Sequence, residues 1–184
     1  GSDVVTFHLV DTDASVKVSE DSMRNMETPF DDQGNLRGWV KVPSDCALYE
    51  YTELSEDGKV VRNQEVPYVV VKKEVSLAGR HIKSASVMDD GMFDSIYVDF
   101  TLDGEGTKTF ASLTYRNIGK ALAVISDGEL KSVATIMEAV LEGEVAMLGF
   151  SREEIYALQK VLSTGSLDIP LNLIEVKTVI VKQQ

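Results

Sequence analysis

The 184-residue sequence contains few of the residues that build disulfides and metal sites, since it has one cysteine and two histidines. Cys46 has no second cysteine with which to form an internal disulfide, and a single thiol does not indicate a redox compartment. Neither His8 nor His81 has the neighbouring His, Cys or Asp residues that would close a zinc tetrahedron. We therefore expect two ordinary surface or half-buried histidines and no metal site.

Long apolar runs are also absent, and basic residues are few. No run of about 18 apolar residues occurs, so no segment is expected to span a bilayer. Gly1 and Ser2 are typical of residues left after removal of a tag, so this lack carries little weight. The 18 Lys and Arg residues are outnumbered by 30 Asp and Glu residues, which gives a formal net charge of -12. Phosphates are bound by clustered cations, so nucleic acid is not an expected partner, and anionic lipid is disfavoured.

Hydrophobic residues make up 43% of the sequence and charged residues 26%, which is typical of a folded globular protein. The length fits one compact domain, or one domain with an appended subdomain. Strict alternation of apolar and polar residues makes Ser95 to Leu102 the clearest predicted strand. The other predicted strands are 4–10, 39–42, 47–51, one long strand over 68–77, 121–125, 145–148 and 171–181.

Apolar residues at helical spacing predict three helices. The first contains Phe110 and ends at Gly119, a residue that can adopt positive φ; residues 127–128 then form an Asp-Gly turn. The second covers 132–141, with Ser132 as its N-cap and Gly143 after its end. The third begins with a Ser-x-x-Glu capping box at Ser151. Residues 14–66 contain turn compositions at 31–35 and 56–59 and are interpreted as a hairpin-rich insertion.

Strands and helices interleave without the regular βαβ order of a parallel sheet. The predicted fold class is therefore α+β, with a mixed or antiparallel sheet packed against two or three helices.

Motifs that carry chemistry are incomplete. Gly119-Lys120 lacks the earlier glycine and the following Ser or Thr of a phosphate-binding loop, and Gly104-Glu105-Gly106 lacks the third glycine of a dinucleotide fingerprint. The latter is interpreted as a turn before a helix, and no cofactor is expected. A Ser-His-Asp triad stays open, because its members need not be close in sequence, but no serine is singled out.

Acidic pairs at 11/13, 31–32 and 89–90 lack the alternating acids and terminal Glu of a calcium loop, so solvated turns are expected. Met88, Met92 and Phe93 lie around the last of these pairs. A flexible apolar loop of this kind can accept varied hydrophobic partners, although such side chains more often anchor a core.

Several segments follow one another in an order that resembles the head region of the first periplasmic domain of the SecD/SecDF protein-export family. The resemblance covers about residues 67–175, and a preceding strand at 7–10 also matches. The segments that carry it are Tyr68 to Ala85, the Phe110, Thr114, Asn117, Gly119-Lys120, Leu122-Ala123 and Asp127-Gly128 pattern, Gly149-Phe150-Ser151, and Leu162 to Leu171.

The resemblance implies a SecD-head-like core over 67–175, preceded by the strand and insertion of 3–66 and followed by a terminal strand over 176–184. It implies an extracytoplasmic module that binds an emerging unfolded secretory polypeptide, moves relative to a membrane-anchored base and catalyses no covalent reaction. The Sec translocon would be a partner through the full-length protein. The resemblance names no polypeptide-binding residues.

The sequence departs from the family pattern at three places, namely Ser132-Val133-Ala134, Gly165 to Asp168, and Glu175 to Lys177. The family's Asp-x-x-Gly-Gly element and its membrane helices are also absent. A stand-alone secreted or lipid-anchored binding protein that reuses the fold is the alternative. A hydrolase on this fold has the least support, because no nucleophile, base and orienting group can be named together.

Overall fold

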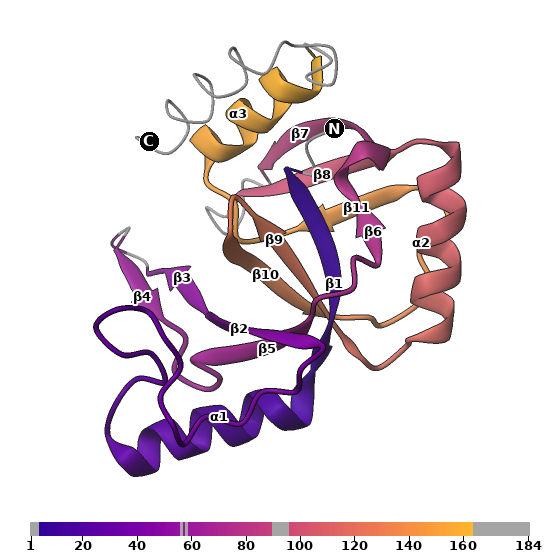
Figure 1. Cartoon of the computed structure of the whole chain (residues 1–184). Coiled ribbons are helices and arrows are strands. Elements are labelled where there is room, and N and C mark those ends of the chain that lie inside the picture. Colours follow the sequence, from indigo (N-terminus) through magenta and orange to yellow (C-terminus); the bar gives the residue numbers. More distant parts are fainter. Residues whose placement is uncertain (1–3, 56, 58, 90–95, 164–184) are drawn as a thin grey trace. The chain divides into compact units, whose positions relative to one another are not determined.

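The computed structural model describes residues 4–55, 57, 59–89 and 96–163. These residues form three α-helices, one 3₁₀ helix and eleven strands (Figure 1). The chain divides into two compact units, each assembled from separate stretches of sequence. The five-stranded unit contains Thr6–Ser76 and Asn117–Met137, and the three-stranded unit contains Gly1–Val5, Leu77–Arg116 and Glu138–Gln184.

The five-stranded unit is built on strands in the order β10-β9-β1-β5-β2. Their bounds are β1 Val5–Asp11, β2 Cys46–Glu50, β5 Tyr68–Lys72, β9 Ala121–Ser126 and β10 Glu129–Thr135. Helix α1, Thr12–Asn25, packs on β5, and β3, Thr52–Leu54, forms a hairpin with β4, Val60–Arg62. The two ends of the strand order contact each other, because β10 also touches β2.

Strand β5 is buried on both faces, which explains its unbroken apolar sequence. Val69 and Val71 pack on one face with side chains of β9 and β10. Tyr68 and Val70 pack on the other face, with Val18 of α1. A strand with only one covered face would instead alternate apolar and polar residues.

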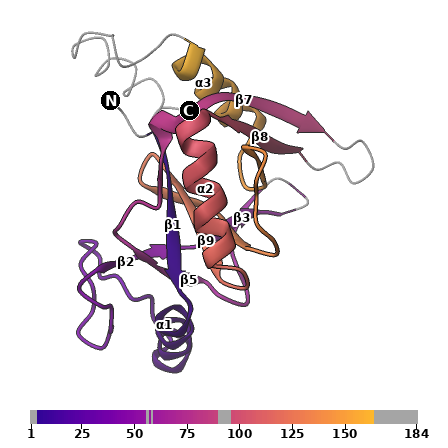
Figure 2. The same ribbon diagram turned by 90° about the vertical axis from the view of Figure 1, so that its right-hand side faces the viewer.

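The three-stranded unit has an antiparallel sheet in the order β11-β8-β7. Its elements are β6 Leu77–Ala78, the 3₁₀ helix Gly79–His81, β7 Ile82–Asp89, β8 Ile96–Leu102, α2 Gly104–Arg116, β11 Glu144–Met147 and α3 Arg152–Ser163. One sheet face is buried, with Phe100 in edge-to-face contact with Phe150 at 5.8 Å. Helix α3 packs on β7, as Figure 2 shows, and buries Ile155 and Leu158.

Most predicted elements are confirmed, and so is the α+β class. The strands predicted at 4–10, 47–51, 95–102, 121–125 and 145–148 correspond to β1, β2, β8, β9 and β11. The third helix begins with the predicted capping box, in which the Glu154 amide donates to Ser151 Oγ at 3.1 Å and the Ser151 amide donates to Glu154 Oε1 at 3.0 Å. Gly119 has φ 88°, and Asp127 and Gly128 turn the chain between β9 and β10 with φ 53° and 76°.

The helix predicted over 132–141 is wrong. Residues up to Thr135 belong to β10, which pairs with β9 beyond the Asp127-Gly128 turn. Met137 and Leu141, which the helical spacing placed on a buried face, are 79% and 64% exposed. The tight turn imposes an antiparallel return strand, and this outweighs the helical periodicity.

The interpretation of 14–66 as hairpin-rich missed α1. The buried side of this helix is formed by Ser15, Val18, Ser19 and Ser22, so it has almost no apolar stripe. Two of these serines bond the backbone of β5: Val70 N–H donates to Ser15 Oγ at 2.7 Å, and Ser19 Oγ donates to the Tyr68 carbonyl at 3.0 Å. Buried hydroxyls are stable there because they are paired.

Three smaller expectations are also corrected. The single strand expected over 68–77 is split into β5 and β6, residues 39–42 are not a strand, and Gly104 and Gly106 lie inside the first turn of α2 rather than before it. Val40 and Val42 owe their apolar character to packing near Val18. The strand predicted at 171–181 lies outside the described residues, and the segment boundaries at 66/67 and 175/176 stay predictions.

Candidate functional site

Two members of a possible catalytic triad come together in the three-stranded unit. His81 Nδ1 lies 3.1 Å from Asp103 Oδ1, and the ring is buried. Asp103 precedes α2 and caps it, because its Oδ1 accepts from the Gly106 amide at 2.7 Å. This amide, and then His81, lower the pKa of the Asp103 carboxyl.

The His81–Asp103 pair has the geometry of a base and its orienting group, but its partners are structural. In the described part of the chain no serine hydroxyl bonds to His81. The ring instead packs against the first turn of α2, where a Cβ on Gly106 would lie 2.6 Å from His81 Cβ. The pair therefore locks α2 onto the 3₁₀ helix.

His8 is likewise a buried structural residue. Its Nδ1 donates to the carbonyls of Lys72 and Glu74 at 2.7 and 3.1 Å, and Nε2 lies 2.8 Å from Thr6 Oγ1. These bonds hold the bend between β5 and β6, which is why the expected long strand is interrupted.

Cys46 is also buried, and burial and then its contact with Asp45 raise the pKa of the thiol. A thiol of raised pKa is a poor nucleophile at neutral pH.

In two of the acidic pairs, 11/13 and 31–32, the first aspartate serves local structure. Asp11 caps α1 by accepting from the Ala14 amide at 3.0 Å. Asp31 accepts from the amides of Asn35 and Gln33 at 2.9 Å each, and these bonds lower the pKa of its carboxyl. Within the described residues, no group of three or more His, Cys, Asp or Glu side chains could hold a metal ion.

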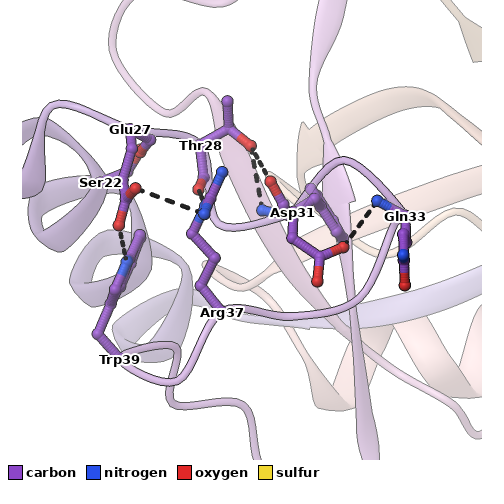
Figure 3. Close-up of polar contacts among 8 residues, drawn as sticks. Ser22, Glu27, Thr28, Asp31, Gln33, Arg37 and Trp39 are labelled. Atoms are coloured by element: carbon purple, nitrogen blue, oxygen red, sulfur yellow. Dashed lines mark hydrogen bonds and ion pairs between the residues drawn. The ribbon is translucent and has the colours of Figure 1, made fainter.

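Asp31 belongs to a polar network that orders the loop after α1 (Figure 3). Trp39 Nε1 donates to Glu27 Oε1 at 2.7 Å, and Arg37 forms an ion pair with the same carboxylate at 3.5 Å. Beside this network Met23 is 71% exposed, and Met26 ends α1 in the left-handed region with φ 55° and is 91% exposed. Methionines of this kind suit adaptable apolar contacts, and the sequence interpretation did not single them out.

The outer face of the three-stranded sheet carries a pair of carboxylates. Glu144 of β11 lies opposite Thr101 of β8, whose Oγ1 donates to its two oxygens at 3.1 and 3.3 Å. Asp99 lies opposite Ala146, one position along the same face. Burial, followed by the hydrogen bond and charge of Glu144, raises the pKa of the Asp99 carboxyl.

The edges of the two sheets differ in how they are covered. In the five-stranded unit the edge strands β2 and β10 contact each other. In the three-stranded unit α3 covers β7, and Gln159 Nε2 donates to the Ala85 carbonyl at 2.8 Å. Among the strands that the structure describes, none pairs with the outer side of β11. Exposed strand edges can pair with another chain.

The loop predicted to accept hydrophobic partners is only partly described. Met88 and Asp89 end β7, and Met88 is 39% exposed. Met92 and Phe93 lie outside the described residues.

None of the helices in the described ranges is long and apolar enough to cross a membrane.

The sequence matches the family model described as SecDF, P1 head subdomain, over residues 52–169. Among curated proteins, the protein translocase subunit SecD of Treponema pallidum is 35% identical over 94% of this chain, and that of Rickettsia conorii is 37% identical over 95%. The chain spans 29% of the length of each of these relatives.

Solved structures of SecDF share the fold. A structure of SecDF described as a membrane component that enhances protein export aligns with a TM-score of 0.52 at 22% identity, covering 90% of this chain and 64% of its own. SecDF in a super-membrane-facing form aligns with a TM-score of 0.53 at 23% identity, covering 92% of this chain and 20% of its own. With the family model matching more than half of the sequence, the chain belongs to the SecDF P1 head subdomain family.

Proposed function

We propose that this chain is the extracytoplasmic part of a SecD-type protein-export accessory and that it binds unfolded polypeptide without covalent chemistry. The family match over residues 52–169 is the observation that carries this proposal. Relatives that match nearly the whole chain are named protein translocase subunit SecD. Export delivers chains before they fold, so a binding module in this pathway must recognise features common to extended polypeptides.

Two physical features support binding of extended chains. A strand edge that lacks a partner in the described residues presents backbone donors and acceptors to any sequence, because every residue except proline carries both groups. The exposed methionines Met23 and Met26 offer side chains that adapt to varied apolar surfaces. Neither feature requires a particular client sequence.

The absence of covalent chemistry is part of the proposal. His81 and Asp103, which have the geometry of a base and its orienting group, bond to each other and to the first turn of α2. Cys46 is buried, and the pKa of its thiol is raised. Both groups serve the fold, which favours a binding role over a catalytic one.

At the level of the whole protein, we propose that the chain lies on the outer side of the cytoplasmic membrane and is tethered by segments outside this sequence. There it would approach the Sec translocon and move relative to a membrane-anchored base. Its net charge of -12 makes nucleic acid an unsuitable partner.

Binding of one polypeptide in two states tests the proposal. A disulfide-containing protein is labelled and titrated with the 184-residue chain, once oxidised and folded and once reduced, alkylated and unfolded. Fluorescence anisotropy at low and high salt should show saturable binding that favours the unfolded form and weakens as salt rises. Equal binding of both forms, or binding of neither, would remove direct recognition of unfolded polypeptide from the proposal.

A further inference from the structure

Strand β11 has one side free among the described residues, and its hydrogen-bonding groups can be assigned from the pairing. Leu102 N–H donates to the Gly143 carbonyl at 2.8 Å, so residues 102 and 143 form a hydrogen-bonded pair. Antiparallel ladders alternate such pairs with pairs that exchange no bonds. Glu144 and Ala146, opposite Thr101 and Asp99, are therefore the residues whose N–H and C=O groups point away from β8.

Among the described residues, the two carboxylates on this face have no cationic partner. Thr101 is the hydrogen-bond donor to Glu144, and neither Glu144 nor Asp99 forms an ion pair with any described Lys or Arg. Two like charges on adjacent strands are unfavourable. Burial, and then the hydrogen bond and charge of Glu144, raise the pKa of the Asp99 carboxyl, and no cation among the described residues lowers it. A positive charge from outside would relieve this repulsion.

Exposed apolar side chains lie just outside both ends of this edge. Leu141 precedes β11 and is 64% exposed, and Leu148 follows it and is 60% exposed. Val145 and Met147 point to the buried face. The free edge thus offers backbone groups at its centre, negative charge on its outer face and apolar contacts beyond its ends.

We propose that the outer edge of β11 adds an extended polypeptide segment carrying Lys or Arg, whose cationic side chains bind the Asp99 and Glu144 carboxylates. This rests on the proposed function and names the kind of segment recognised and the place where it binds. Strand addition supplies main-chain hydrogen bonds to Glu144 and Ala146, independent of sequence. Alternate side chains of the added strand lie on the same sheet face as the two carboxylates. The carboxylates then favour Lys or Arg at these alternate positions.

Other edges among the described residues suit this occupant less well. Strand β7 is covered by α3, and its Ala85 carbonyl is already bonded to Gln159. Strands β2 and β10 contact each other. Compared with these three strands, β11 therefore suits the occupant better, because it combines a side that is unpaired among the described residues with uncompensated negative charge.

The test compares two labelled peptides of about ten residues, the usual upper length of a strand. Both peptides are built on alternating Thr and Val. At the same alternate positions, one peptide carries Lys and the other carries Glu. The Lys peptide should bind the chain at least about tenfold more tightly than the Glu peptide, the difference expected for a charge-assisted contact, and the difference should shrink at high salt. On binding, the Glu144 and Ala146 amides should become protected from hydrogen exchange.

Two variants probe the backbone and the charge separately. Ala146→Pro removes an outward N–H that does not bond to β8, and Asp99→Asn with Glu144→Gln removes both charges. Each should weaken binding of the Lys peptide about tenfold. The matched control is Glu20→Gln with Glu65→Gln, which changes net charge equally at two exposed positions and should leave affinity within about twofold. Circular dichroism confirms that each variant is folded.

The outcomes separate this inference from the proposed function. If unfolded polypeptide binds the chain but the Lys and Glu peptides bind equally, or the variants bind as the control does, then the β11 edge is not the site and the proposed function stands. Amides of Glu144 and Ala146 that are already protected in the free chain would overturn the inference in the same way. If no unfolded polypeptide binds at all, the proposed function fails and the inference with it.

Discussion

Replacing Gly106 by alanine tests whether the His81–Asp103 pair locks α2 in place. The new Cβ would lie 2.6 Å from His81 Cβ and 3.1 Å from Asp103 Oδ1. Carbon atoms pack best at about 3.5–4.0 Å, so the 3₁₀ helix or α2 must move by about 1 Å. Overpacking of this kind costs about 1–3 kcal/mol, and weakening of the Asp103 cap adds about 0.5–2 kcal/mol. Alanine recovers about 0.5–1 kcal/mol of helix propensity, so the middle of these ranges gives a net loss of about 2.5 kcal/mol.

The matched control is Gly104→Ala in the same helical turn. No atom lies within 4 Å of a Cβ built on Gly104, so this change should be neutral or stabilise by up to about 1 kcal/mol. Urea unfolding gives both free energies, and Gly106→Ala should lower the melting temperature by about 4–12 °C. Equal stabilities of the two variants would show that the close approach to His81 does not constrain α2.

Three further predictions concern the cap, the turn and the carboxylate pair. Ser151→Ala should lower the free energy of unfolding by about 1 kcal/mol, because the Glu154 amide loses its acceptor; Ser151→Thr, which keeps the hydroxyl, should lose less in the same urea titration. Asp127→Ala should cost about 1 kcal/mol, because φ is 53° there, whereas Asp127→Asn should be nearly neutral; thermal melts compare the two. The pKa of Asp99 is raised in the folded chain, so folding is favoured as pH falls through that pKa and disfavoured above it. Asp99→Asn should therefore raise the melting temperature at pH 7, and this gain should shrink at pH 4; an equal gain at both pH values would contradict the assignment.

The sequence is sufficient to predict a strand or helix where local chemistry and packing require the same element. In β8, alternation buries Val98, Phe100 and Leu102 on one face, so period and environment agree. The capping box at Ser151 is another such case, because both of its hydrogen bonds form within one helical turn. These elements could be predicted without knowing what packs against them.

Predictions from the sequence are wrong where a partner distant in sequence decides the local conformation. Helix α1 buries Ser15 and Ser19, and these serines are favourable there because β5 supplies bonding groups. Nothing in the local sequence reveals that partner. The bend after β5 has the same origin, since His8 bonds the carbonyls of Lys72 and Glu74 from a strand more than 60 residues away.

The error at 132–141 has a different cause, since the deciding signal was present in the sequence. The sequence predicts a turn at Asp127-Gly128, and a two-residue turn of this kind joins antiparallel strands. Strand β10 follows directly, although its residues also fit a helical period over a longer window. A tight hairpin turn after an apolar strand should therefore outweigh periodicity in the residues that follow.

The candidate site could not be predicted because it depends on strand register. Thr101 and Glu144 are separated by 43 residues and meet only when β11 pairs with β8 in the observed alignment. A slip of one residue would turn Val145 and Met147 to the outer face and Glu144 into the core, where an unpaired carboxylate is costly. The buried Val145 and Met147 therefore fix the register and, with it, the carboxylate pair on the outer face. Val145→Ala weakens this anchor without touching a carboxylate. If β11 stays paired with β8, this change should reduce binding of the Lys peptide less than Ala146→Pro does. If β11 does not stay paired, hydrogen exchange at Val145 and Met147 should rise and binding of the Lys peptide should be lost.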